Sequence, residues 1–184
     1  MKVKAQYFTL KNGKTVLLRS PEESDALSLL NHTKKTAAET HFLVKTAEEA
    51  QKLSLEKEKI LINAVNESRD SFIIAAFIDD DIVVASAEID CPCRRVKTRH
   101  RASFGIAVSM AEANNGLGTI LTLKAMQTAK QLGFTQIELG VYSDNFRAIH
   151  VYEKCGFQRY GILDKSFRLE DGSFRAEILM VKYL

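Results

Sequence analysis

The sequence contains no hydrophobic run long enough to cross a lipid bilayer. Its longest apolar stretches, such as residues 72–78, are far shorter than the roughly 20 residues of a transmembrane helix. The first residues lead into an alternating pattern and not into the apolar core of a signal peptide. We therefore expect a protein that spans no membrane and is located in the cytoplasm.

Cysteine and excess charge are also scarce. The three cysteines, Cys91, Cys93 and Cys155, are an odd number without a Cys-x-x-Cys pair, which is typical of a reducing compartment. Cys91-Pro92-Cys93 could suggest metal or redox chemistry, but no His and Cys set has the spacing of metal ligands, so we expect no metal site. The net charge of +3 is too small to indicate nucleic-acid binding.

The size and composition favour one domain. A chain of 184 residues, of which 46% are hydrophobic, can bury one substantial core, and no linker, repeat or low-complexity segment divides it. We therefore assign residues 1–184 to a single domain. Its fold class is α+β (mixed α/β), because strand and helix patterns occur along the whole chain.

Periodicity, turn and capping signals predict the secondary structure. Strands are expected at residues 3–10, 15–19, 72–78, 82–89, 102–108, 136–141, 157–169 and 174–183. Helices are expected from residue 20 onwards, from 46 to about 66, and at 117–132 and 145–155. Capping boxes mark the first two helices, with Ser20 and Thr46 as their N-caps.

A glycine turn opens the helix at 117–132. Gly116-Leu117-Gly118 follows two asparagines, and such a turn presents unpaired N–H groups at the positive end of a helix dipole, which suits a phosphate. It is not a P-loop, because Thr119-Ile120 stands where Lys and Ser/Thr are needed. It is not a dinucleotide fingerprint either, because Leu121 occupies the place of the third small residue. The turn therefore favours a pyrophosphate other than that of ATP or NAD.

A second motif follows about thirty residues later in the chain. In Asn145-x-x-Ala148-x-x-x-Tyr152, which continues to Gly156-Phe157, the first three residues fall near one helix face. The small Ala148 permits close approach of another group, and Tyr152 offers a possible proton donor. Taken alone, Tyr152 could also be a core aromatic residue whose hydroxyl is hydrogen-bonded.

Together the two motifs resemble the GNAT superfamily of N-acetyltransferases. The usual pattern of that family is Arg/Gln-x-x-Gly-x-Gly/Ala, followed by Asn-x-x-Ala-x-x-x-Tyr-x-x-x-Gly-Phe. The sequence matches both parts except that Ala113 replaces the Arg or Gln. The resemblance covers about residues 14–184, and it implies a central, mostly antiparallel twisted sheet flanked by helices.

The resemblance also implies an acetyl-CoA-dependent N-acetyltransferase that moves an acetyl group to a primary amine by direct attack on the thioester. A backbone N–H of the strand Ile106-Ala107-Val108, which would pair with the pantetheine arm, would stabilise the oxyanion. Tyr152 would protonate the departing thiolate, whose unperturbed pKa is about 8.5. The other cofactor-binding residues that the resemblance implies are Asn114, Asn115, Gly116, Leu117, Gly118, Thr119, Asn145 and Ala148.

The general base is expected on the strand before the basic connector. Relatives often keep a carboxylate there, and Glu88 holds that place, on the same strand face as Asp90. Glu88 could also be merely solvent-facing. His100 is another candidate because the unperturbed pKa of histidine is near neutrality, and Ser103 could order a water.

The acceptor is not determined by the family resemblance. An amino acid, a polyamine, an amine-bearing antibiotic and a protein N-terminal amine all fit, and we expect the acceptor near Glu39, His41 and Phe42 and at the C-terminal hairpin. A homodimer is a further expectation. Two other classes stay open: a non-catalytic acyl-CoA-binding regulatory module, and an RNA-binding domain that uses the basic connector 94–101.

The absence of Arg or Gln at Ala113 predicts weakened cofactor binding, because that side chain contributes to the phosphate-binding loop in relatives. Replacing Ala113 by Arg should then tighten the binding of acetyl-CoA, as measured by the Kd of each protein. An unchanged Kd would count against this hypothesis.

Overall fold

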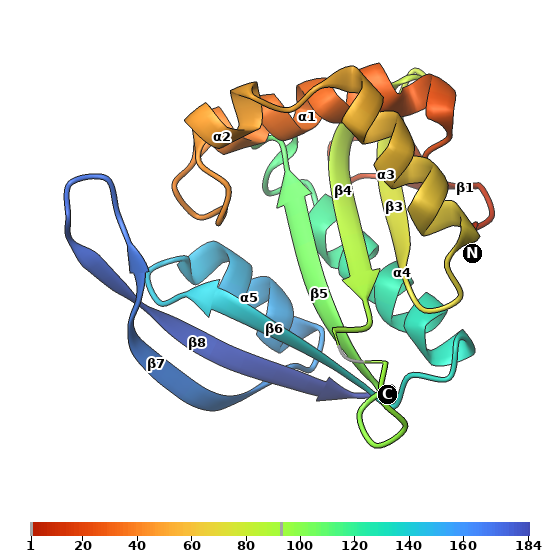
Figure 1. Ribbon diagram of the computed structural model, residues 1–184. Coiled ribbons are helices and arrows are strands. Elements are labelled where there is room, and N and C mark those ends of the chain that lie inside the picture. Colours follow the sequence, from red (N-terminus) through yellow and green to blue (C-terminus); the bar gives the residue numbers. More distant parts are fainter. Residues whose placement is uncertain (1, 93) are drawn as a thin grey trace.

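The computed structural model, which describes residues 2–92 and 94–184, contains an eight-stranded twisted sheet (Figure 1). The strand order is β1-β2-β3-β4-β5-β6-β8-β7. Pairing is antiparallel throughout this sheet except between β5 and β6, which run parallel. The strands are β1 Gln6–Thr9, β2 Thr15–Arg19, β3 Phe72–Ile78, β4 Ile82–Asp90, β5 Arg101–Val108, β6 Gln136–Tyr142, β7 Gln158–Arg168 and β8 Phe174–Tyr183.

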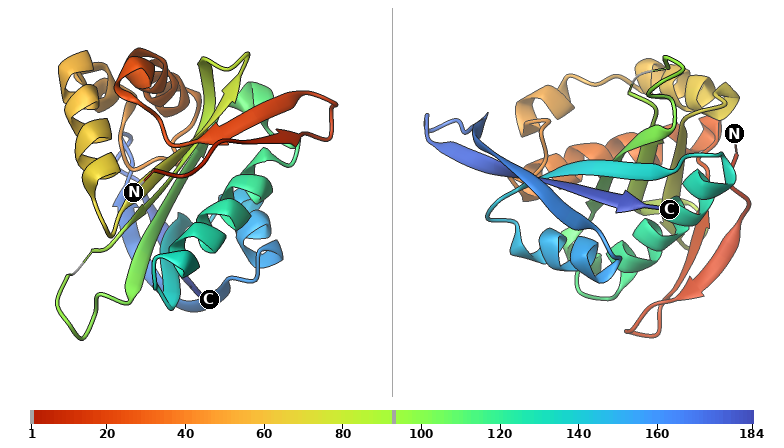
Figure 2. Two further views of the ribbon diagram at one scale, coloured as in Figure 1. Left: turned by 90° about the vertical axis from the view of Figure 1, so that its right-hand side faces the viewer. Right: turned by 90° about the horizontal axis from the view of Figure 1, so that it is seen from below.

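Helices cover both faces of the sheet. Figure 2 shows α1 and α3 on one side of it and α4 and α5 on the other. The helices are α1 Ala26–Glu39, α2 Ala47–Gln51, α3 Leu55–Glu67, α4 Leu117–Gln131 and α5 Phe146–Lys154, with short 3-10 turns at Glu23–Asp25 and Met110–Glu112. Within the part of the chain that the structure describes, no helix has the length and apolar character needed to span a membrane. The expected mostly antiparallel sheet with flanking helices is confirmed.

The sheet separates two hydrophobic cores, and β3 contributes to both. Its residues Phe72, Ile74 and Ala76 join the larger core under α4 and α5, whereas Ala75 and Phe77 join the smaller core under α1 and α3. Because successive side chains of a strand point to opposite faces, a strand buried on both faces consists of continuous apolar residues. This accounts for the unbroken apolar run at residues 72–78.

The predicted start of the first helix at Ser20 is wrong. The Ser20 hydroxyl accepts a hydrogen bond from the Val3 N–H at 3.0 Å and donates one to the Ile73 carbonyl at 2.9 Å. It therefore ties the N-terminal segment to β3 and is not a helix cap. The cap is Glu22, which forms a capping box with Asp25 at the start of the 3-10 turn.

The expected long helix from residue 46 to about 66 is two helices. Thr46 caps α2 with Glu49 as its capping-box partner, as expected, but α2 ends at Gln51. A second cap then begins α3, because Ser54 has an extended backbone and its hydroxyl accepts the Lys57 N–H at 3.3 Å. The other expected helices and strands agree with the structure within a few residues, the largest difference being the shorter β1 at Gln6–Thr9.

Candidate functional site

A cavity of about 500 Å³ lies where β5 and β6 separate. The two strands pair only through Arg101 with Gln136, Ala102 with Ile137, and Ser103 with Glu138. Beyond Ser103, β5 continues to Val108 with pairing to β4, so one edge of residues 104–108 faces the cavity. Alternate residues of a strand direct their N–H and C=O groups to opposite edges, and this edge therefore offers backbone hydrogen-bonding groups to a ligand.

Most of the residues that the sequence assigns to a cofactor line this cavity. They are Ile106, Ala107, Val108, Asn114, Gly116, Gly118, Thr119, Asn145, Ala148 and Tyr152. Leu117 does not contribute its side chain, which is only 1% exposed within the larger core. The prediction for Leu117 therefore holds at most for its backbone. Asn115 lies outside the cavity lining, and its carbonyl accepts the Lys11 N–H at 3.1 Å.

The glycine turn has the backbone geometry that an anion site at a helix N-terminus needs. Gly116 is the N-cap of α4 with φ +87°, a left-handed conformation that disfavours residues with a Cβ. Asn114 is also left-handed, with φ +63°, which asparagine tolerates better than most residues. The first N–H groups of α4 have no acceptor within the helix, and they begin at the wall of the cavity.

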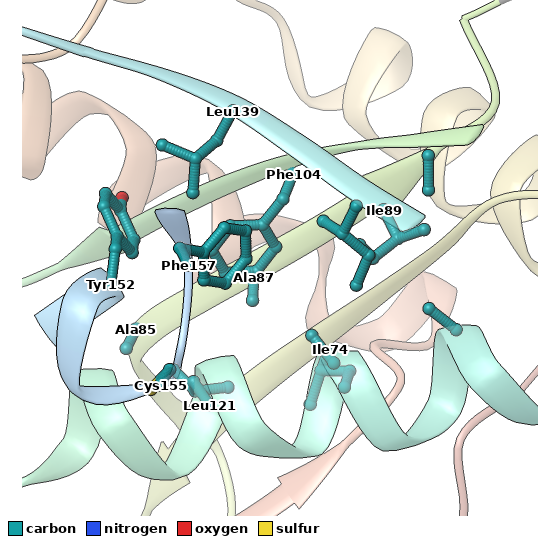
Figure 3. Close-up of a cluster of buried hydrophobic side chains, with 14 of the residues drawn as sticks. Ile74, Ala85, Ala87, Ile89, Phe104, Leu121, Leu139, Tyr152, Cys155 and Phe157 are labelled. Atoms are coloured by element: carbon teal, nitrogen blue, oxygen red, sulfur yellow. The ribbon is translucent and has the colours of Figure 1, made fainter. Parts of the chain in front are cut away.

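Tyr152 lines the cavity from α5 and is held by aromatic neighbours. Its ring lies edge-on to Phe104 with 6.2 Å between centroids and is tilted against Phe157 at 5.8 Å. Figure 3 shows this group within the larger core, with Phe104 and Phe157 packed together beside Tyr152. Burial raises the pKa of the Tyr152 hydroxyl, and a smaller contribution comes from Cys155. The hydroxyl therefore stays protonated at physiological pH.

Asn145 has a structural role next to Tyr152. It is the N-cap of α5, and its Oδ1 accepts the Ala148 N–H at 3.2 Å. Because Asn145 and Ala148 both also line the cavity, the cap fixes the helix turn that faces a ligand. The spacing of this motif is thus explained by helix capping as well as by ligand access.

Glu88 lies on β4, one strand away from the opening between β5 and β6. It pairs in register with Gly105, and antiparallel partners project to the same face of a sheet. Gly105 lines the cavity, and a Cβ built on it would meet no atom within 4 Å. The Glu88 side chain, although exposed to solvent, has a raised pKa because surrounding protein desolvates it and Asp90 repels its charge, with Lys45 acting in the opposite direction.

The other candidates for a base lie less favourably. His100 is in the connector before β5 and does not line the cavity. The Ser103 hydroxyl donates to the Asp90 carbonyl at 3.2 Å, and Ser103 lies at the closed end of the β5–β6 opening. Glu88 does not line the cavity either, but it pairs in register with Gly105, which does, and this pairing favours Glu88 over the other two candidates.

The segment that follows α1 also lines the cavity. Phe42 contributes to the lining, and its ring lies 5.8 Å from that of Tyr142, which stacks on Phe167 at 3.7 Å. His41 contacts Phe42 and lies 3.9 Å from the Asp144 carboxylate. Glu39 does not reach this region, because its carboxylate accepts the Met110 N–H at 2.8 Å.

Gly140 of β6 is a lining residue that the sequence analysis missed. A Cβ built on it would lie 1.7 Å from the Oε1 atom of Glu177, so only glycine leaves room for this carboxylate. The Glu177 carboxylate also accepts a hydrogen bond from Ser166 at 2.6 Å. An isolated glycine inside a strand signals close approach of another group, so the sequence did contain a clue to this position.

Two arginines of the basic connector 94–101 are engaged within the protein. Arg94 pairs with Asp70 at 2.7 Å, and Arg101 pairs with Glu138 at 2.5 Å. These ion pairs reduce the charge available to RNA at this connector. Cys91 and Cys155 are buried, while Cys93 lies outside the described residues. No group of three or more potential metal ligands is found among residues 2–92 and 94–184.

His32 on α1 supports the strand that lines the cavity. It is 3% exposed, its Nδ1 lies 3.2 Å from the Ser109 hydroxyl, and the backbone of Ala107 is a further hydrogen-bond partner. Burial lowers the pKa of His32 from 6.5 to about 4, against the opposing influence of Ala107 and Glu39. His32 is therefore neutral in the folded protein at neutral pH.

The low pKa of His32 predicts a loss of stability on mild acidification. As the pH falls from 6.5 towards 4, the unfolded state takes up a proton at this histidine and the folded state does not. The free energy of unfolding should fall by about 2 kcal/mol between pH 7 and pH 5 from this group alone. Urea unfolding at both pH values measures this fall in the free energy of unfolding. The fall should be smaller by about 2 kcal/mol in His32→Gln than in the wild-type protein. Equal differences in both proteins would contradict the assignment.

The chain is similar to known acetyltransferases in sequence. Residues 29–157 match the model of the acetyltransferase (GNAT) family. Over 102 residues the chain is 35% identical to the L-amino acid N-acetyltransferase AaaT of Escherichia coli strain K12, a match that covers 55% of this chain and 61% of that protein. The chain thus spans less than two thirds of the length of this relative.

The chain is also similar to solved acetyltransferase structures. The acetyltransferase of the GNAT family from Streptococcus pneumoniae superimposes with a TM-score of 0.86 at 27% identity, over 92% of this chain and 99% of that one. The acetyltransferase yncA of Salmonella typhimurium, solved with its cofactor acetyl-CoA, has a TM-score of 0.80 at 14% identity, over 92% of this chain and 94% of that one. At that identity the second similarity supports the fold alone.

Proposed function

The chain belongs to the GNAT acetyltransferase family, and we propose that it transfers the acetyl group of acetyl-CoA to a primary amine. The observation that carries this proposal is the cavity between β5 and β6, which joins a helix N-terminus of the phosphate-binding type to an open strand edge. A phosphate-bearing end and an extended thioester-bearing arm, the two parts of acetyl-CoA, fit these two features in that order.

Acetyl-CoA supplies an acyl group on a thiolate leaving group. We propose that Glu88 accepts the proton that an ammonium acceptor must lose before its nitrogen can attack. A backbone N–H on the free edge of residues 106–108 then donates to the oxygen on which negative charge develops. The nitrogen bonds to the acetyl carbon, the carbon–sulfur bond breaks, and the proton that the new amide loses balances the one that the departing thiolate needs to become the free thiol. Tyr152 donates a hydrogen bond to this sulfur from the opposite wall of the opening.

Two observations support this distribution of roles. Gly105 leaves open space beside Glu88, so an amine can reach the plane of the strands next to a carboxylate. Tyr152 lines the same cavity from α5, and its contacts with Phe104 and Phe157 limit the motion of its ring. These two observations support a base on β4 and a hydrogen-bond donor on α5.

The test is an amine panel scored by release of the free thiol of CoA. The panel should include L-amino acids, because the Escherichia coli relative is named for them, together with a polyamine, an aminoglycoside and a peptide with a free N-terminus. Thiol release that depends on an amine, with the acetylated amine found by mass spectrometry, would support the proposal. Binding of CoA without thiol release from any amine would favour a non-catalytic acyl-CoA-binding module instead.

A further inference from the structure

The cavity obtains a cation from a part of the chain that the motifs do not include. Ala113 lines the cavity but has only a methyl group where relatives place a basic or amide side chain. Lys11, from the turn between β1 and β2, lines the same cavity. More than 100 residues separate Lys11 from the glycine turn in the sequence, so the contact is purely tertiary.

The Lys11 backbone is fixed against the glycine turn. Its N–H donates to the Asn115 carbonyl at 3.1 Å, one residue before Gly116. Its side chain crosses Gly116, with Cγ and Cε each 3.8 Å from the position that a Cβ on Gly116 would occupy. The Lys11 side chain therefore extends along the turn whose N–H groups open α4, which is where a phosphate would be bound.

The β1–β2 hairpin is held on this loop by further contacts. Lys14 forms an ion pair with the buried carboxylate of Glu112 at 2.6 Å, and Lys124 of α4 donates to the Gln6 side chain at 3.0 Å. Glu112 itself lines the cavity, so the Lys14 ion pair also offsets a negative charge that would repel a phosphate. The hairpin thus contributes to the electrostatics of the site as well as to its wall.

Other basic side chains in the cavity lie on a different element. Arg147 and Lys154 belong to α5, and the Arg147 guanidinium contacts the Met110 sulfur at 3.3 Å. Lys11 is distinguished from both by its contacts with Asn115 and Gly116. Of these three basic residues, Lys11 is therefore the one that contacts the glycine turn.

We propose that Lys11 supplies the positive charge that Ala113 lacks and that its ammonium group binds the pyrophosphate of CoA. This inference rests on the proposed function, since it concerns the same cofactor site. It assigns the N-terminal hairpin a role in binding the cofactor. It also predicts that the site tolerates Ala113 because the charge comes from a different segment.

Calorimetric titration with CoA tests this role without requiring turnover. Lys11→Ala should raise the Kd for CoA about three- to tenfold, the effect of losing a partly exposed charge-assisted contact, and Lys11→Arg should largely retain the affinity. The backbone bond to Asn115 uses the Lys11 N–H and is preserved in both variants. Lys130→Ala removes the same charge at the end of α4, away from the cavity, and should leave the Kd unchanged.

Dephospho-CoA identifies which phosphate Lys11 binds. This probe keeps the pyrophosphate and lacks the 3′-phosphate, so Lys11→Ala should weaken its binding by the same factor as that of CoA. An effect confined to CoA would place the ammonium at the 3′-phosphate and overturn the assignment. The effect should also shrink as salt is raised, because it arises from charge.

Ala113→Arg provides the decisive comparison. If Lys11 compensates for Ala113, the new arginine should restore CoA affinity to Lys11→Ala and should improve the wild-type protein less. An equal gain in both backgrounds would show that the two positions act independently and would contradict the proposal. A wild-type protein that binds no CoA would instead refute the proposed function, and an unchanged Kd in Lys11→Ala would refute only the role of Lys11.

Discussion

Replacing Tyr152 by Phe is expected to lower kcat by about 10²–10³-fold, the usual effect of removing one hydrogen-bond donor to the charge that develops in the transition state. The affinity for CoA should change little, because the variant keeps the ring that packs against Phe104 and Phe157 and loses only the hydroxyl. Steady-state thiol release together with calorimetric CoA binding separates the two quantities. A kcat equal to that of the wild-type protein would reject the role of Tyr152.

The pKa of Tyr152 refines this expectation. Burial raises it, so the hydroxyl is protonated across the working pH range and the loss on substitution should not depend on pH. The pKa of a free thiol is about 8.5, and a phenol of raised pKa holds its proton more tightly than such a thiol. Tyr152 should therefore act chiefly by donating a hydrogen bond to the forming thiolate. Tyr160→Phe, at an exposed tyrosine of β7 outside the cavity lining, is the matched control and should leave kcat unchanged.

Replacing Glu88 by Gln is expected to lower kcat about a hundredfold or more at neutral pH, since the amide cannot accept the amine proton. A base must be ionised to accept a proton, so on the proposed role of Glu88 the activity should fall as the pH drops through its raised pKa. The variant should lose this acid limb of the pH–rate profile. Glu56→Gln, at an exposed carboxylate of α3, serves as the control.

Asp90 provides an independent check of this role for Glu88. Its charge contributes to the raised pKa of Glu88, so Asp90→Asn should lower that pKa and move the acid limb to lower pH. The maximal rate should be preserved, because the substitution leaves the Glu88 carboxylate itself in place. An acid limb that survives in Glu88→Gln would assign the base to another group.

The motif-bearing half of the fold was predictable because its signals are local. Gly116 adopts a left-handed φ that its residue type permits, and Asn145 caps the helix that its motif implies. The hairpin of residues 72–78 and 82–89 also followed from the sequence, since the turn Asp79-Asp80-Asp81 joins two adjacent apolar runs. In each case the determining interaction lies within a few residues of the signal.

Most features that the sequence analysis predicted wrongly or did not find depend on contacts between distant parts of the chain. Ser20 carries a capping sequence, but its hydroxyl bonds Val3 and Ile73, which no local pattern reveals. The break between α2 and α3 is the exception, because Ser54 caps α3 through the nearby Lys57 N–H, a local signal that the sequence analysis did not use. Lys11 was missed because its contacts with the glycine turn form only when the hairpin packs beside Gly116. Long-range contacts of this kind leave no periodicity in a single sequence.

The short pairing between β5 and β6 leaves one edge of β5 unpaired, and such an edge carries a risk of aggregation. A free strand edge is a template for the strands of other chains, and exposed edges promote aggregation. Here the edge of residues 104–108 lies inside a cavity walled by α5 and by the segment after α1. A polypeptide strand carries side chains on both faces and needs more width than a slender unbranched arm. The cavity walls thus shield the unpaired edge of β5 from the strands of other chains while leaving room for a narrower ligand.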